Sequence, residues 1–101
     1  MSVELFSEKD PGETLTCAMD FVNILATGET ISAASISIST YAGVDASSSS
    51  LLSGAVSISG TQIRHNIQGG LDGVTYRLRF VATTNLSKVY VGAGYLPVNQ
   101  V

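Results

Sequence analysis

The side chains best suited to catalysis or metal binding in this sequence are one histidine and one cysteine, His65 and Cys17. His65 shares strand parity with Ile63 and Ile67, and no second ligand lies at the spacing of a metal site. A hydrogen-bonded histidine at a sheet end or a subunit contact is therefore favoured over a general base or a metal ligand. Cys17 lies alone in an alternating apolar pattern, which favours a buried thiol that behaves as a small hydrophobic side chain.

Other short patterns resemble catalytic or cofactor motifs but lack their context. None of the serines lies in a G-x-S-x-G elbow, and no D-x-D-x-D run supplies calcium ligands. Gly92-Ala93-Gly94 resembles part of a phosphate-binding loop, but no helix can follow it in the seven residues that remain. Small residues in a final strand instead indicate close packing by another backbone or side chain. We therefore predict no catalytic, metal or cofactor-binding residue, and no cofactor; the protein is not expected to be an enzyme.

The composition restricts the classes of partner. Charged residues make up 13% of the 101 residues, the formal net charge is -3, and the basic residues are scattered apart from Arg77 and Arg79. Nucleic-acid binding needs clustered Lys and Arg, so it is not expected. Residues 1–6 lack the pattern of a signal peptide, and no stretch approaches the roughly 20 apolar residues of a membrane span. We therefore expect synthesis in the cytoplasm and no membrane partner.

Alternation of apolar and polar residues dominates the chain and predicts strands. A one-residue slip of phase inside residues 31–38 is typical of a β-bulge. The pair Ser59-Gly60 predicts a tight turn, and residues 44–50 predict a loop or hairpin tip. A helix is the competing interpretation for residues 15–26. The predicted strands cover residues 15–21, 31–38, 52–58, 62–68, 74–82 and 88–96, the last ending at Pro97.

Short strands separated by Gly, Ser and Asn turns predict an all-β fold, an immunoglobulin-like or fibronectin-III-like Greek-key β-sandwich of about seven strands. We expect residues 1–101 to form a single domain with a short N-terminal arm and a C-terminal tail. Asp72, Gly73 and Tyr76 open the most regular strand. In Greek-key sandwiches a tyrosine at this place bonds its hydroxyl to the backbone a few residues upstream, and Gly73 allows the tight approach. An ordinary cross-strand tyrosine is the alternative.

Several short motifs carry a resemblance to a known family. They are Lys9-Asp10-Pro11, Leu15, Asp20-Phe21, Leu25, Gly28-Glu29-Thr30-Ile31 and, later, Gly73, Tyr76 and Leu78. In this order they resemble small tailed-bacteriophage virion proteins with an Ig-like fold, of the fibre–tail adaptor kind or related tail and head components. The resemblance covers most of residues 9–82. This chain lacks the tryptophans that such proteins often carry in their first two strands.

The resemblance implies a function in assembly. It implies a non-enzymatic structural component of a bacteriophage virion, an adaptor between tail and fibre or baseplate proteins that acts through protein–protein contacts. The implied partners are other virion proteins of the tail, fibre or capsid, with multiple copies of this chain on a symmetric assembly. A capsid decoration (cement) protein and a stand-alone Ig-like module that binds a glycan or a protein remain the alternatives.

Three segments are candidate contact surfaces: the N-terminal arm Ser2–Asp10, the serine loop Ala46–Ser50, and the C-terminal strand with its tail Tyr95–Val101. For each segment, a solvated terminus or a flexible loop tip is the alternative. Apolar side chains are costly to leave in water, so we expect the tail to be the docking element. The candidate docking residues are Tyr95, Leu96, Val98 and Val101.

Overall fold

The computed structural model of the chain describes residues 2–6 and 8–100, and of residues 2–5 it describes the backbone alone. The strands are β1 (Ser2–Leu5), β2 (Thr14–Asp20), β3 (Ile31–Ala42), β4 (Leu52–Ser59), β5 (Gln62–Gln68), β6 (Val74–Thr84) and β7 (Val89–Val98), with one 3-10 turn, η1 (Ser48–Leu51). The all-β class predicted from the alternation is confirmed. The competing helix over residues 15–26 is wrong, because β2 pairs with β5 along its whole length.

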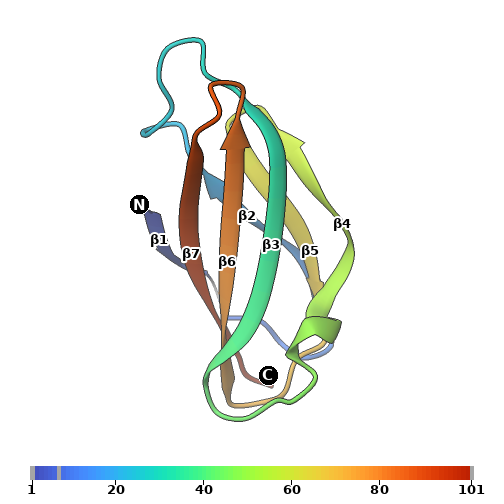
Figure 1. Ribbon diagram of the computed structural model, residues 1–101. Helices are drawn as coiled ribbons and strands as arrows, with labels where there is room; N and C mark the ends of the chain where they lie inside the picture. The colour runs from blue at the N-terminus through green and yellow to red at the C-terminus, as the bar shows by residue number, and fades with distance from the viewer. Residues whose placement is uncertain (1, 7, 101) are drawn as a thin grey trace.

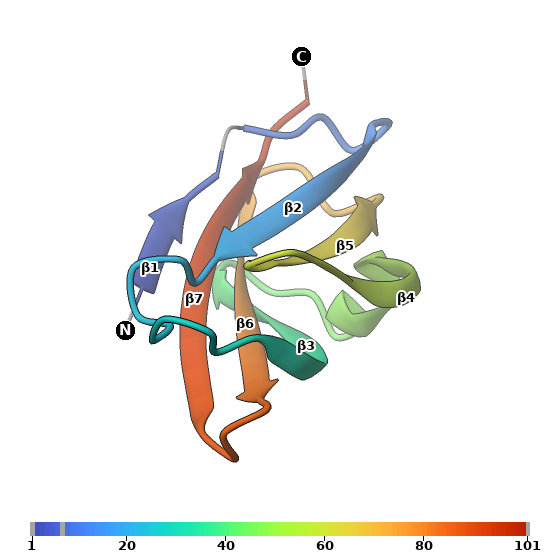
Figure 2. The same ribbon diagram turned by 90° about the horizontal axis from the view of Figure 1, so that it is seen from above.

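Two sheets pack face to face and make a β-sandwich (Figures 1 and 2). One sheet has four strands in the order β1-β7-β6-β3, and the other has three in the order β2-β5-β4. β1 runs parallel to β7, and every other pair of strands is antiparallel. Seen from above, the chain crosses from one sheet to the other between β2 and β3 and again between β3 and β4 (Figure 2).

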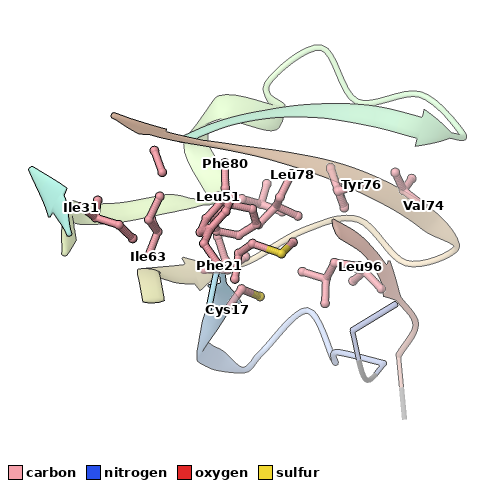
Figure 3. Packing of buried hydrophobic residues seen from close by; sticks show 14 residues of the cluster. Cys17, Phe21, Ile31, Leu51, Ile63, Val74, Tyr76, Leu78, Phe80 and Leu96 are labelled. Atoms are coloured by element: carbon pink, nitrogen blue, oxygen red, sulfur yellow. The ribbon is translucent and has the colours of Figure 1, made fainter. Parts of the chain in front are cut away.

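The core lies between the two sheets and follows from the alternation of each strand (Figure 3). Even-numbered residues of β6 are buried in turn, whereas the odd-numbered ones are half-buried or exposed. Tyr76, Leu78 and Phe80 are fully buried, and they meet Met19 and Phe21 from the side of β2. Because apolar burial is the main favourable term in folding, this one-sided pattern fixes which face of each strand is turned inward.

Packing at β7 explains the Gly92-Ala93-Gly94 sequence. A Cβ on Gly92 would lie 2.9 Å from Met19 Cγ, and one on Gly94 would overlap the ring of Phe6. The Phe6 ring in turn packs edge-on against Phe80, with ring centroids 6.3 Å apart. The predicted close packing at this segment is therefore confirmed, and glycine is required there by space.

The bulge in β3 also agrees with the sequence. Its register against β6 shifts between Ile31 and Ala33, so Ile31 is buried while Ile36 and Ile38 continue the inward face on the other parity. A second shift lies between Thr40 and Ala42. A bulge adds one residue to a strand and re-aims the side chains beyond it.

Residues 2–6 and 89–98 pair within the sandwich, at the places where the sequence predicts an arm and the start of a tail. β1 pairs with β7, and the backbone N–H of Phe6 donates to the Tyr95 carbonyl. β7 runs on through Pro97, two residues past Leu96, and its last residue Val98 pairs with Val74. The Pro97 carbonyl accepts the Lys9 N–H on the side away from β6, and the backbone nitrogen of a strand residue points to the same side as its carbonyl, so the missing N–H of Pro97 removes no bond to β6.

Candidate interaction surface

The residues that the structure describes form no pocket, and they contain no group of three or more His, Cys, Asp or Glu side chains that could hold a metal ion. Among the same residues, no helix is both long and apolar enough to cross a membrane. The surface and the buried polar groups are therefore the places where a function has to be sought.

Cys17 and His65 face each other across β2 and β5, on the inward side of the three-stranded sheet. Cys17 is buried, and desolvation raises the pKa of its thiol to about 11. A thiol with such a pKa stays protonated at neutral pH and is a poor nucleophile, so its predicted role as a small hydrophobic side chain is confirmed. The Nδ1 atom of the buried His65 ring lies 2.8 Å from the Asn66 carbonyl oxygen, within hydrogen-bond distance.

Tyr76 links the start of β6 to the loop that follows β3. Its hydroxyl accepts the Leu71 backbone N–H at 2.9 Å and donates to Asp45 Oδ2 at 2.7 Å. Desolvation, followed by the bond to Asp45, raises the pKa of Tyr76 to about 12. Gly73 has φ +82° and donates its N–H to the Val98 carbonyl, and Asp72 accepts the Gln100 N–H. Asp45 was not foreseen as the acceptor, because 31 residues separate it from Tyr76.

Lys9 is a buried charge that the sequence analysis missed. Its side chain is fully buried, and its Nζ donates to the Gly69 carbonyl at 2.7 Å and to the Asp10 carbonyl at 2.9 Å. Desolvation lowers its pKa, and the nearby Glu13 and Asp10 carboxylates oppose that shift. A buried lysine destabilises a protein unless it has such hydrogen-bond partners. The bonds of Lys9 therefore hold the N-terminal segment against the sheet. In the sequence, the Lys9-Asp10-Pro11 motif is the feature that marks this lysine.

Glu29 makes a similar connection at the opposite end of β6. Its carboxylate accepts the Thr84 hydroxyl at 2.7 Å, the Ala26 backbone N–H at 2.9 Å and the Tyr90 hydroxyl at 3.3 Å. The bond from Ala26, followed by that from Thr84, lowers the pKa of Glu29. These hydrogen bonds connect the loop between β2 and β3 to the residues on both sides of the turn between β6 and β7.

The predicted docking residues do not lie together at the surface. Leu96 and Val98 are fully buried in the core of this chain, opposite Tyr76 and Val74. Their proposed exposure is wrong, because the inward parity of β7 continues through them. Val101 lies outside the described residues. Tyr95 is half-buried on the outer side of β7, and it alone of the four is placed on the outer surface by the described structure.

The serine loop is held by its own hydrogen bonds. Ser47 donates its N–H to Asp45 Oδ1 at 2.9 Å, and the Ser50 hydroxyl donates to the Ser47 carbonyl at 2.7 Å. Leu51, at the end of η1, is buried in the core. The loop is thus anchored on both sides, and its serines lie close to the Tyr76–Asp45 bond.

The outer face of the four-stranded sheet carries two tyrosines and two arginines, which we call the Tyr–Arg patch: Tyr41, Arg77, Arg79 and Tyr95. The Tyr41 and Tyr95 rings meet edge-on with centroids 4.6 Å apart, and Tyr41 is 66% exposed. In the strand register, Arg77 lies beside Tyr95 of β7. On the β3 side, the exposed Ser39 and Ser37 lie beside Arg77 and Arg79. Within the described part of the chain, neither arginine has a hydrogen-bond or ion-pair partner.

The outer face of the three-stranded sheet is a network of polar side chains bonded to one another. Arg64 donates twice to Gln62 Oε1, at 2.9 and 2.7 Å, and Thr16 donates to Asn66 at 2.7 Å. Asp20 accepts the Thr61 hydroxyl at 2.7 Å and the Val22 N–H at 2.9 Å. These bonds, led by the one from Thr61, lower the pKa of Asp20.

Comparison with protein-family models gives a match over most of the chain. A family model described as podophage GP4 fiber-tail adaptor protein gp77 matches residues 9–94, which is most of the chain. The match begins at the buried Lys9 and ends at Gly94, the glycine that makes room for Phe6. No curated protein and no solved structure matches the chain significantly.

Proposed function

Because the chain belongs to the podophage GP4 fiber-tail adaptor family, we propose that it is a non-enzymatic component of the virion that joins the tail to fibre or baseplate proteins. The family match over residues 9–94 is the observation that carries this proposal. It covers six of the seven strands in part or whole, so the shared family pattern includes nearly all of the sandwich.

The strand order supports an immunoglobulin-like Greek-key fold within a single domain. In the constant-type immunoglobulin domain, strands B, E and D share one sheet, and strands G, F and C share the other. The orders β2-β5-β4 and β7-β6-β3 correspond to these two sheets, with β1 on the outer edge of β7. The bond from Leu71 to the Tyr76 hydroxyl supports a tyrosine corner, in which Asp72 and Gly73 shape the turn before β6.

Such a fold suits an adaptor because each of its two sheets has an outer face that can contact another protein. Buried polar bonds at Lys9, Tyr76 and Glu29 connect the loops and the N-terminal segment to the sheets. Rigid elements position a contact surface more accurately than free loops do, and they lose less entropy on binding. We propose that the partners are other virion proteins, contacted by several copies of this chain on a symmetric particle.

Immunogold labelling of purified particles tests this function. An antibody against the folded protein should label the particles at the junction of tail and fibres. A capsid decoration protein would instead place the label over the whole head. Absence of the protein from purified particles would contradict a structural role in the virion and would favour a stand-alone binding module.

A further inference from the structure

We propose that the Tyr–Arg patch is the docking surface of this adaptor and that it binds a protein surface rich in Asp and Glu. This inference rests on the proposed function and adds to it the chemistry of the partner. Its basis is a contrast of charge: the protein has a formal net charge of -3, yet Arg77 and Arg79 lie side by side on one face.

The face that carries the patch has basic but no acidic side chains in three of its strands. β3, β6 and β7 contain no Asp or Glu, and their only charged residues are Arg77 and Arg79. Like charges set against each other destabilise an interface. Stacking this face against the same face of a second copy would therefore bring four arginines together without a carboxylate from these strands.

Of the other three basic residues, Lys9 and Arg64 already have hydrogen-bond partners, and the exposed Lys88 precedes β7 and interacts electrostatically with Glu29. Lys9 is buried against two carbonyls, and Arg64 is bonded to Gln62. Arg77 and Arg79 have no partner among the described residues. A guanidinium covered by a partner needs acceptors, and a carboxylate supplies two oxygens in matching geometry. An acidic partner thus satisfies both arginines, whereas a neutral apolar one would leave them desolvated and unpaired.

The neighbours of the arginines suit a protein partner. Tyrosine and arginine are enriched in the centres of protein interfaces, and the Tyr41–Tyr95 pair offers a rigid aromatic surface beside Arg77. Ser37 and Ser39 are small, so they leave the arginines accessible from the side of β3. Two arginines on an acidic protein are too few to hold a nucleic acid, which requires many phosphate contacts.

In Figure 1, β7, β6 and β3 lie in front of the other sheet, and no loop of the described chain is drawn across their outer face. Half-buried Val91 and Pro97 and the exposed Val89 extend the face along β7. The patch is therefore open to a partner along three strands, with an apolar border on one side.

Incorporation into particles tests the proposal with matched variants. Phage lacking the protein would be complemented with wild type, with the double variant Arg77→Glu/Arg79→Glu, or with Arg64→Glu as a control on the opposite sheet. Copies per purified particle would be counted by quantitative mass spectrometry. We expect the double variant to lose at least about tenfold in incorporation, because it repels an acidic partner, and the Arg64 variant to lose less than about twofold. Arg77→Lys/Arg79→Lys should recover only part of the copies, because it keeps the charge but loses the two-donor geometry of the guanidinium.

A photo-crosslink identifies the chemistry of the partner. Tyr41 would be replaced by p-benzoyl-phenylalanine, with Thr14 on the outer face of β2 as the control position, and crosslinked particles would be digested and sequenced. We expect Tyr41 crosslinks to a different virion protein, in a segment with clustered Asp and Glu. Crosslinks to a second copy, to DNA, or to a segment without acidic residues would overturn the proposal.

These experiments separate the two proposals. If wild-type protein is absent from particles, the adaptor function fails and the docking inference fails with it. If wild-type protein is present and the Arg77→Glu/Arg79→Glu variant enters particles equally well, the docking inference alone fails. Circular dichroism of each purified variant would establish that it folds. If the double Glu variant does not fold, the Tyr41 crosslink on an otherwise wild-type chain decides the question.

Discussion

Both outer faces of the sandwich contain polar side chains, but the two faces differ in how many of these side chains are hydrogen-bonded to one another. On the three-stranded sheet, Arg64, Asp20 and Thr16 each bond to another side chain of the same face. On the four-stranded sheet, Arg77 and Arg79 have no partner in the described part of the chain, and two tyrosine rings pack beside them. A face of the first kind offers a partner few unbonded donors, whereas covering a face of the second kind allows new bonds to form.

This difference indicates where function resides in a protein whose described residues form no pocket. An arginine held by its own sheet is already partnered, so a binding partner gains little from it. An arginine without a partner among the described residues gains no such bond within the isolated fold, and it is available for a charged contact. The predictions below test this contrast, in order of decreasing effect.

The largest effect should separate two neighbouring residues of β7. Leu96 is fully buried opposite Tyr76, whereas Tyr95 lies half-buried on the outer face. We expect Leu96→Ala to lower the free energy of unfolding by about 2–5 kcal/mol, because it opens a cavity in the core. Tyr95→Ala should cost less than about 1 kcal/mol, because the side chain is only half-buried and its ring packs against the exposed Tyr41 ring. Urea denaturation of both variants would measure this, and equal losses would contradict the inward and outward assignment.

The bond between Tyr76 and Asp45 belongs to neither face, and its loss should have an intermediate effect. Tyr76→Phe leaves the Leu71 N–H and the Asp45 carboxylate without their shared partner, which should cost about 1–3 kcal/mol. The raised pKa of Tyr76, about 12 against a usual value of 10.0, means that the neutral hydroxyl stabilises the fold. That stabilisation is complete below pH 10 and is lost as the pH rises toward 12. Unfolding of wild type and variant should therefore converge at high pH, and a constant difference would contradict the bond.

A smaller effect is expected for the polar network of the three-stranded sheet. Asp20→Asn keeps the shape of the side chain but removes its charge, and the expected cost at pH 7 is below about 1 kcal/mol because the site is exposed. The folded-state pKa of Asp20 is lowered by its bonds, led by Thr61. Its stabilisation is therefore present above the usual value of 3.8 and is lost as the pH falls through the lower folded-state pKa. A wild-type advantage that grows in acid would contradict this assignment.

The smallest effect on stability should come from the Tyr–Arg patch. Arg77→Gln/Arg79→Gln should change the free energy of unfolding by no more than about 0.5 kcal/mol, because neither arginine is held by a described residue. Thermal unfolding at low and moderate salt would measure it. A loss above 1 kcal/mol, roughly the upper end for an exposed ion pair, would mean that the arginines stabilise the chain itself and are not reserved for a partner.

Most of the fold could be predicted from the alternation of side chains, because that alternation reports which face of a strand is buried. The strand ends were harder. Pro97 suggested that the last strand stops, yet Leu96 and Val98 share one parity and belong to the core. Proline removes one donor from a strand but leaves the direction of its neighbours unchanged, and that parity was the more reliable signal.

The candidate surface could be predicted only in part. The sequence predicts Tyr95 as one docking residue of a tail, and it shows that the basic residues are scattered apart from Arg77 and Arg79. Tyr41 could not be linked to Tyr95, because their contact depends on the order of β3, β6 and β7 in the sheet. The burial of Lys9 also depends on long-range pairing, since its acceptor on Gly69 lies 60 residues away.

A cryo-electron microscopy map of purified particles tests the central claim most directly, because it identifies which face of each copy is covered. We predict that the Tyr–Arg patch lies against an acidic surface of a tail or fibre protein, with carboxylates beside Arg77 and Arg79. The face with Arg64 and Asp20 should be turned to solvent. A map in which the three-stranded sheet makes the contact and the Tyr–Arg patch is exposed would contradict the account.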